Sequence, residues 1–129
     1  MAQTREAIAT KAAPAAVGPY SQAIRVGEMV FTAGQIPLDP RTGTIVAQDI
    51  EQQTEQVMQN LQAVLEAAGS SFARTVKLTC FITDMADFAA VNAVFERHLQ
   101  RPYPARSCVE VAALPRGAAI EVEAVALTG

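Results

Sequence analysis

Four side chains of this sequence carry chemistry that a binding or catalytic site could use: Tyr20, Arg106, Cys108 and Glu121. Arg106 follows Pro104 in the segment PARSCVE, whose alternating pattern is typical of a strand. A backbone held in this way fixes the guanidinium, whose planar fork suits a carboxylate or a phosphate. The other interpretation is an edge-strand arginine paired with a surface glutamate, and the spacing favours neither.

Glu121 begins the next expected strand, 15 residues after Arg106. In an antiparallel pair the two residues would lie beside each other or on a diagonal. They would then form a simple ion pair, or Glu121 would be partly desolvated and so a better proton acceptor near neutral pH. Glu123 has the same strand parity and is a candidate for the same role.

Cys108 and Tyr20 each have two interpretations. Cys108 could act as a nucleophile, but the single histidine, His98, falls at the polar end of an expected helix, so a Cys that lines a pocket fits better. Cys80 alternates with apolar residues and is expected in the core. Tyr20 follows Gly18 and Pro19 in a loop of fixed shape, where it either caps a pocket or packs.

Periodicity and turn signals predict the elements that must position these residues. A helix begins at Asp49, which can cap it, and ends before Gly69. A second helix is expected from Asp84 to Arg101. Two strands are expected at 21–26 and 29–33 around a tight turn, and three more at 75–83, near 106–111 and at 120–127. In the strand at 75–83, one face would carry Val76, Leu78, Cys80 and Ile82.

This order predicts a single α+β domain spanning residues 1–129, with two helices packed on one face of a mixed sheet. The other face would expose Phe81, Val125 and Leu127. A monomer gains little from leaving such a face in water. We therefore expect this sheet face to pack against other subunits.

Composition excludes several classes of function. The formal net charge is −3 and there is no run of Lys or Arg, which argues against nucleic acid as a partner. One His and two distant Cys do not make a zinc site, and no glycine has the spacing of a nucleotide-binding loop, so we expect no metal and no cofactor. No membrane span or secretory segment is evident, and we expect a reduced, cytoplasmic protein.

Four segments together resemble the Rid (YjgF) family of imine and enamine deaminases. They are GPYSQA at 18–23, TAGQIPLDPRTG at 32–43, PARSCVEVAALP at 104–115 and IEVEAVAL at 120–127. The resemblance implies a chorismate-mutase-like α+β fold and a homotrimer, in which the sheets form an inner barrel and three sites lie in clefts between subunits. It also implies hydrolysis of 2-imino acids, such as 2-iminobutanoate and 2-iminopropanoate, to 2-keto acids and ammonia without a cofactor.

The same resemblance assigns roles residue by residue. It implies that Arg106 clamps the substrate carboxylate and that Glu121 positions or activates water. Cys108 would line the site and Tyr20 would close it. The remaining implied ligand contacts are the backbone of Gly34 and the following residue, Gln35. Ala33 stands where the family more often has Ser, which leaves the preferred imino acid open.

Three other functions remain open from the sequence. The first is a trimer that binds small carboxylates, such as 2-keto acids, without turnover. The second is endoribonuclease activity or inhibition of translation, against which the acidic charge argues. The third is a structural or chaperone-like trimer whose clefts are inert.

Overall fold

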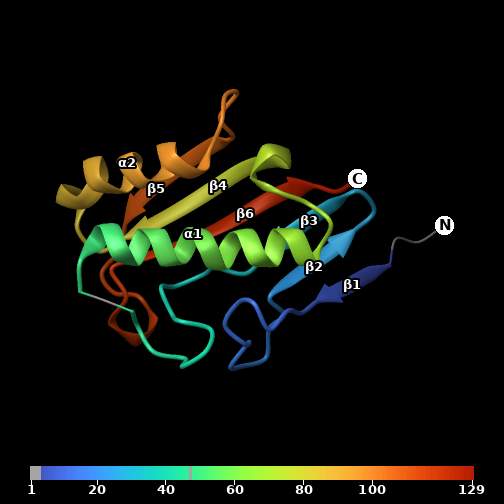
Figure 1. The fold of residues 1–129 in the computed structure, drawn as a ribbon, viewed down its shortest axis with the longest axis horizontal. Helices are drawn as coiled ribbons and strands as arrows, with labels where there is room; N and C mark the ends of the chain where they lie inside the picture. The colour runs from blue at the N-terminus through green and yellow to red at the C-terminus, as the bar shows by residue number, and fades with distance from the viewer. Residues whose placement is uncertain (1–3, 47) are drawn as a thin grey trace.

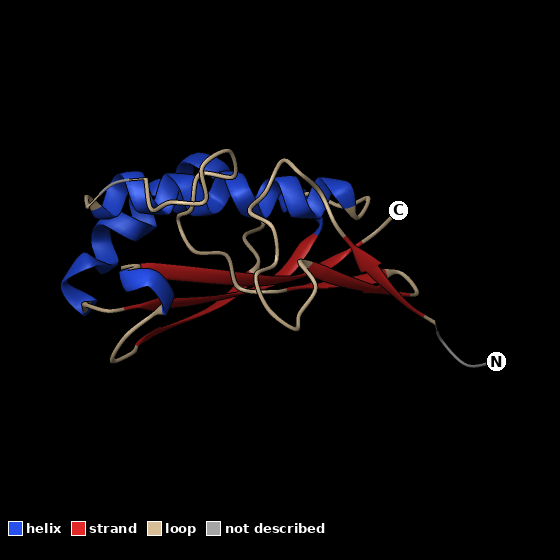
Figure 2. Cartoon of the chain, turned by 90° about the horizontal axis from the view of Figure 1, so that it is seen from below, coloured by secondary structure: helices blue, strands red, loops and turns tan. Residues whose placement is uncertain are grey.

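The computed structural model describes residues 4–46 and 48–129. A six-stranded sheet carries both α-helices on one face (Figures 1 and 2). The strands are β1 (Arg5–Ile8), β2 (Ala23–Val26), β3 (Met29–Thr32), β4 (Thr75–Ile82), β5 (Ala105–Glu110) and β6 (Ile120–Leu127), and the helices are α1 (Ile50–Ala67) and α2 (Phe88–His98). The predicted α+β class is confirmed. Strand β1 was not predicted, because REAI is short and polar.

The strand order in the sheet is β1-β2-β3-β6-β4-β5. All neighbours are antiparallel except β4 and β5, which are parallel because α2 returns the chain between them. The C-terminal strand β6 therefore lies in the middle of the sheet, between β3 and β4 (Figure 1). The expected antiparallel pair of β5 with β6 is wrong, since β4 separates the two strands.

Helix α1 begins and ends where its sequence signals predict. The Asp49 side chain accepts a hydrogen bond from the Glu51 N–H at 2.9 Å, which satisfies a free donor of the first turn. At the other end Gly69 adopts φ +82°, and the Ser70 N–H donates to the Leu65 carbonyl at 2.8 Å. This glycine-dependent cap stops the helix.

The core lies between the two helices and the sheet. Its helical side is the apolar stripe of α1 with the buried face of α2, and its sheet side comes mainly from β3, β4 and β6. All of the following side chains are fully buried: Val57, Leu61, Val64 and Leu65 on α1, Val30 on β3, Leu78 and Ile82 on β4, and Ile120 and Val122 on β6. The opposite sheet face carries Phe31 and Val109, each more than two-fifths exposed, beside the half-buried Phe81 and Val125.

Two local predictions were wrong. Val76 does not share the buried face of β4, because a bulge between Thr75 and Lys77 turns its side chain out, where it is 44% exposed. Asp84 does not cap the second α-helix directly. It caps a short 3₁₀ turn, Met85–Asp87, by accepting from the Ala86 N–H, and α2 begins after that turn.

Candidate active site

A cavity of about 440 Å³ lies beside Glu121, at the end of the sheet where β6 begins. Tyr20, Gly34 and Arg116 also line it. Burial, and then the nearby Glu123 carboxylate, raise the pKa of the Glu121 carboxyl above its ordinary value. Glu123 does not line the cavity, so Glu121 is the acid that combines a raised pKa with access to a ligand.

The absence of a side chain at Gly34 leaves the space that the Glu121 side chain occupies. A Cβ added at Gly34 would fall 2.6 Å from Cδ of Glu121, which real contacts do not allow. The next residue, Gln35, fixes the backbone here, because its N–H donates to the Val122 carbonyl at 2.9 Å and its carbonyl accepts from the Val122 N–H at 3.1 Å. Gln35 is buried, and it lines the same cavity.

Tyr20 stands at the mouth of this cavity and is half exposed. Its hydroxyl accepts a long hydrogen bond, 3.4 Å, from the Val17 N–H. Gln22 fixes the loop that carries Tyr20. Its amide nitrogen donates to the Pro14 carbonyl at 2.7 Å, and its amide oxygen accepts from the Thr10 N–H at 2.6 Å. Ala33 also lines the cavity. We call Tyr20, Gly34, Gln35 and Glu121 the glutamate half-site.

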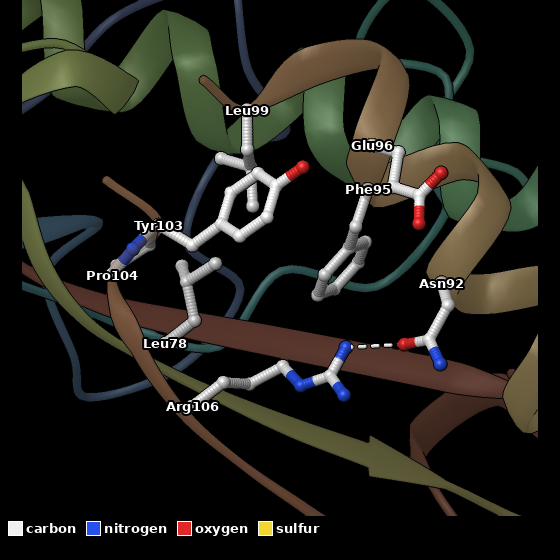
Figure 3. Close-up of a pocket in the computed structure, with 8 residues that line it drawn as sticks. All are labelled: Leu78, Asn92, Phe95, Glu96, Leu99, Tyr103, Pro104 and Arg106. Atoms are coloured by element: carbon white, nitrogen blue, oxygen red, sulfur yellow. Dashed lines mark hydrogen bonds between the residues drawn. The ribbon is translucent and has the colours of Figure 1, made fainter. Parts of the chain in front are cut away.

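Arg106 lies at the start of β5, beside a second cavity of about 360 Å³ under α2 (Figure 3). Its guanidinium donates to the Asn92 side-chain oxygen at 2.5 Å, drawn as the dashed line in Figure 3. The guanidinium carbon lies 5.2 Å from the ring centre of Phe88 and 5.6 Å from that of Phe95. Two aromatic rings and one amide therefore hold this cation in place.

No ion pair between described residues involves Arg106. Strand β5 does lie at the sheet edge, but the alternative prediction that Arg106 pairs with a surface glutamate is wrong for the part of the chain that is described. A guanidinium fixed by neutral groups keeps donors free for an anionic ligand.

Cys108 shares the face of β5 that carries Arg106 and packs partly against the core. Its strand neighbour Cys80 is fully buried, as expected of a core residue. His98 instead bonds to the Glu55 carboxylate at 2.8 Å, which ties α2 to α1. Cys108 does not line the cavity beside Arg106, although the sequence predicted that it lines a pocket. We call Arg106, Asn92 and Phe95 the arginine half-site.

The two half-sites do not meet within one chain. Arg106 pairs with Leu78 on the helix side of the sheet, whereas Glu121 pairs with Phe81 on the opposite side. The two residues are also separated by two strand spacings, about 10 Å, and by three residues along β6, another 10 Å or so. The expectation that they lie beside or diagonal to each other in one sheet, as an ion pair or otherwise, is wrong.

Sequence reasoning missed three residues that shape these half-sites. Asn92 follows Phe88 by four residues and precedes Phe95 by three, so helical spacing could have placed it on their face. The role of Gln22 has no local sequence signal, because its partners are backbone N–H and C=O groups of an irregular loop. Arg116 adopts φ +62° and donates to the Gly43 carbonyl at 2.9 Å, a contact over 73 residues that no pattern predicts.

Among the described residues, no three His, Cys, Asp or Glu side chains gather in a way that could hold a metal ion. None of the helices in the described ranges is long and apolar enough to cross a membrane.

The sheet, the two helices and these two cavities define a small α+β domain with a carboxylic acid beside one cavity and a guanidinium beside the other. The family described as endoribonuclease L-PSP matches residues 10–128. The chain belongs to this family, which is the Rid (YjgF) family.

Several relatives align over nearly their whole length. The 2-iminobutanoate/2-iminopropanoate deaminase of Salmonella typhimurium is 50% identical, over 93% of this chain and 95% of its own. The crystal structure of RidA from an Antarctic Psychrobacter species matches with a TM-score of 0.92 and 46% identity, over 95% of this chain and 99% of that one. The crystal structure of Escherichia coli TdcF with bound serine matches with a TM-score of 0.91 and 45% identity, over 96% and 99%.

Proposed function

We propose that this protein hydrolyses 2-imino acids, such as 2-iminobutanoate and 2-iminopropanoate, to 2-keto acids and ammonia. The observation that carries the proposal is a pair of complementary groups. Arg106 is a fixed cation with no carboxylate partner among the described residues, and Glu121 is a carboxyl of raised pKa beside a cavity. The relative named as a deaminase of these imino acids supports the same reaction.

In the proposed reaction Arg106 binds the substrate carboxylate through two parallel hydrogen bonds. This contact orients the C2 carbon, which is already electrophilic in the imine. Glu121 accepts a proton from water as the water oxygen bonds to C2. The C=N electron pair moves to nitrogen, which takes the proton from Glu121 and gives a carbinolamine. The hydroxyl proton of this intermediate then passes to nitrogen as the C–N bond breaks and the C=O bond forms, and the 2-keto acid and ammonia leave. The chemistry balances with water alone and needs no cofactor.

The other residues have supporting roles in this proposal. Tyr20 closes the mouth of the cavity, and the backbone at Gly34 and Gln35 contacts the ligand. Cys108 lies on the same strand face as the arginine. Ala33 in place of a serine removes one hydroxyl from the cavity wall, which bears on the choice of imino acid.

We further propose that the complete site forms between subunits of a homotrimer. Because the arginine and glutamate half-sites lie on opposite faces of one sheet, two copies of the chain are needed to join them. The apolar sheet face with Phe31, Phe81 and Val109 provides a surface for assembly. Sedimentation equilibrium tests this, and a stable monomer at micromolar concentration would contradict it.

The activity is tested with 2-iminobutanoate generated in situ by a threonine dehydratase. Semicarbazide traps the imine, so a deaminase lowers the rate of semicarbazone formation. We expect native protein to compete with the trap, Arg106→Lys to fail although it keeps the charge, and Glu121→Gln to bind keto acid without turnover. Competition by Arg106→Lys equal to that of native protein would refute the carboxylate clamp. An inactive native protein that still binds keto acid through Arg106 would favour a binding role.

A further inference from the structure

Cys80 and Cys108 face each other across the two parallel strands β4 and β5. They are directly paired in register, and both side chains point to the helix side of the sheet, as Leu78 and Arg106 do one pair earlier on this face. Paired residues on adjacent strands are about 4.8 Å apart. This spacing falls within the range of roughly 4.4–6.8 Å that a disulfide spans between Cα atoms. Both cysteines are free thiols.

The two thiols differ in their access to solvent. Cys80 is fully buried, whereas Cys108 is partly exposed on the outer strand. Burial raises the pKa of the Cys80 thiol, and the adjacent Cys108 thiol raises it further. An oxidant from solvent therefore meets Cys108, while Cys80 is held within reach and protected. Reversible cysteine oxidation uses this arrangement of an accessible thiol and a resolving neighbour.

We propose that Cys108 and Cys80 form a reversible oxidation site for hydroperoxides, in which Cys108 reacts and Cys80 resolves. The Cys108 thiolate attacks one peroxide oxygen, the O–O bond breaks, and a sulfenic acid forms as water or an alcohol leaves. The Cys80 sulfur then bonds to the Cys108 sulfur, the S–O bond breaks, and the leaving hydroxide takes the Cys80 thiol proton and departs as water. Two thiols are oxidised by two electrons and one hydroperoxide is reduced.

This bond would also regulate the arginine half-site. Cys108 is two residues from Arg106 on the same strand face, so a bond to Cys80 would fix β5 to β4 directly beside the arginine. The effect on imine hydrolysis rests on the proposed function. The thiol chemistry does not, because it depends only on the two cysteines.

The test treats the native protein with hydrogen peroxide, blocks the remaining thiols with an alkylating agent after unfolding, and maps peptides without reduction. We expect both alkylatable thiols to be lost, the intact mass to fall by two hydrogens, and one cross-linked peptide pair that dithiothreitol releases. The matched control, Cys80→Val, keeps an apolar side chain in the core. In this variant Cys108 should proceed to sulfinic acid, which dithiothreitol does not reverse.

Two kinds of oxidation product would overturn the proposal. One is sulfinic acid at Cys108 of the native protein while Cys80 remains alkylatable. The other is a disulfide between two chains on a non-reducing gel. Semicarbazide competition is measured on the same samples and should fall on oxidation and return on reduction. A cross-link in a protein without imine hydrolysis would refute the proposed function alone, and hydrolysis without a cross-link would refute the oxidation site alone.

Discussion

Mixing two inactive variants tests whether the site forms between chains. Arg106→Ala removes the proposed carboxylate clamp and Glu121→Gln removes the proposed base. Losing a charge-assisted bidentate contact costs about 3 kcal/mol, or roughly a hundredfold in rate. Losing a positioned general base costs on the order of a hundredfold or more. Each variant alone should therefore be nearly inactive. The two lesions lie on opposite faces of the same sheet. Variant chains refolded together should therefore complement each other.

The expected recovery follows from the placement of the half-sites. In the proposed trimer each site takes its arginine from one subunit and its glutamate from another. In a random one-to-one mixture the first subunit carries an intact Arg106 half of the time, and the second an intact Glu121 half of the time. About a quarter of the sites should then be complete, and about a quarter of native activity should return, whatever the number of subunits in the ring.

The assay is semicarbazide competition for 2-iminobutanoate, with native mass spectrometry to verify that mixed assemblies form. The matched control mixes Arg106→Ala with Arg106→Lys. Both lesions then lie in the arginine half-site, no combination of subunits is intact, and no activity should return. If mixed assemblies of Arg106→Ala and Glu121→Gln form but stay inactive, the two residues do not share a site across chains and the reasoning fails.

Three further predictions follow from the site geometry. Asn92→Ala should lower kcat/KM about tenfold, the effect of losing one hydrogen bond to a charged group. Asn92→Asp should raise KM further, because the new carboxylate competes with substrate for Arg106. Equal steady-state kinetics in the two variants would contradict this prediction. Gly34→Ala should fold, as judged by circular dichroism. It should lose about a hundredfold in rate, because the added Cβ displaces the Glu121 carboxylate. Native-like turnover of this variant would contradict the prediction. Glu121→Gln should leave Tm unchanged below pH 4.5, the ordinary carboxyl value, and raise it at pH 8. Because the pKa of Glu121 is higher in the folded than in the unfolded chain, ionised Glu121 destabilises the fold once the pH exceeds the ordinary carboxyl value. This penalty is absent at low pH, where the carboxyl is protonated in both the folded and the unfolded chain. A Tm difference that does not change with pH would refute the assignment.

The sequence predicted correctly those helix and strand ends that depend on interactions between residues close together in the chain. The cap at Asp49, the left-handed Gly69 and the turn at Gly27 each act within a few residues, so the bounds of α1 and of the β2–β3 hairpin could be predicted closely. The Val76 bulge could not be predicted in this way. Period-two alternation assumes that the hydrogen-bond ladder between two strands is uninterrupted. Strand β4 has one extra residue opposite β6, and the side chains before this bulge point to the face opposite to the one that alternation predicts.

The position of β6 could not be predicted from the strand order in sequence. The last strand passes its neighbour in sequence, β5, and pairs with β3 and β4, because the α2 crossover places β5 at the sheet edge. Proximity in sequence therefore suggested a cross-strand contact of Arg106 with Glu121 that the fold does not make. The candidate site residues were identified by residue type and resemblance, but their grouping into two half-sites needed the topology.

This topology also bears on the competing functions. A trimer that only binds small carboxylates needs the fixed Arg106 cation, and the energetic cost of burying Glu121 near Glu123 would serve no purpose in it. A carboxyl of raised pKa close to a guanidinium would also lose that shift, since the cation stabilises its charged form. Arg106 and Glu121 lie on opposite faces of one chain, so Arg106 does not lower the pKa of Glu121 there. In the proposed trimer a second chain brings the two together only with a substrate carboxylate between them. A substrate that neutralises Arg106 would then leave Glu121 the stronger base, which is the state that water activation requires.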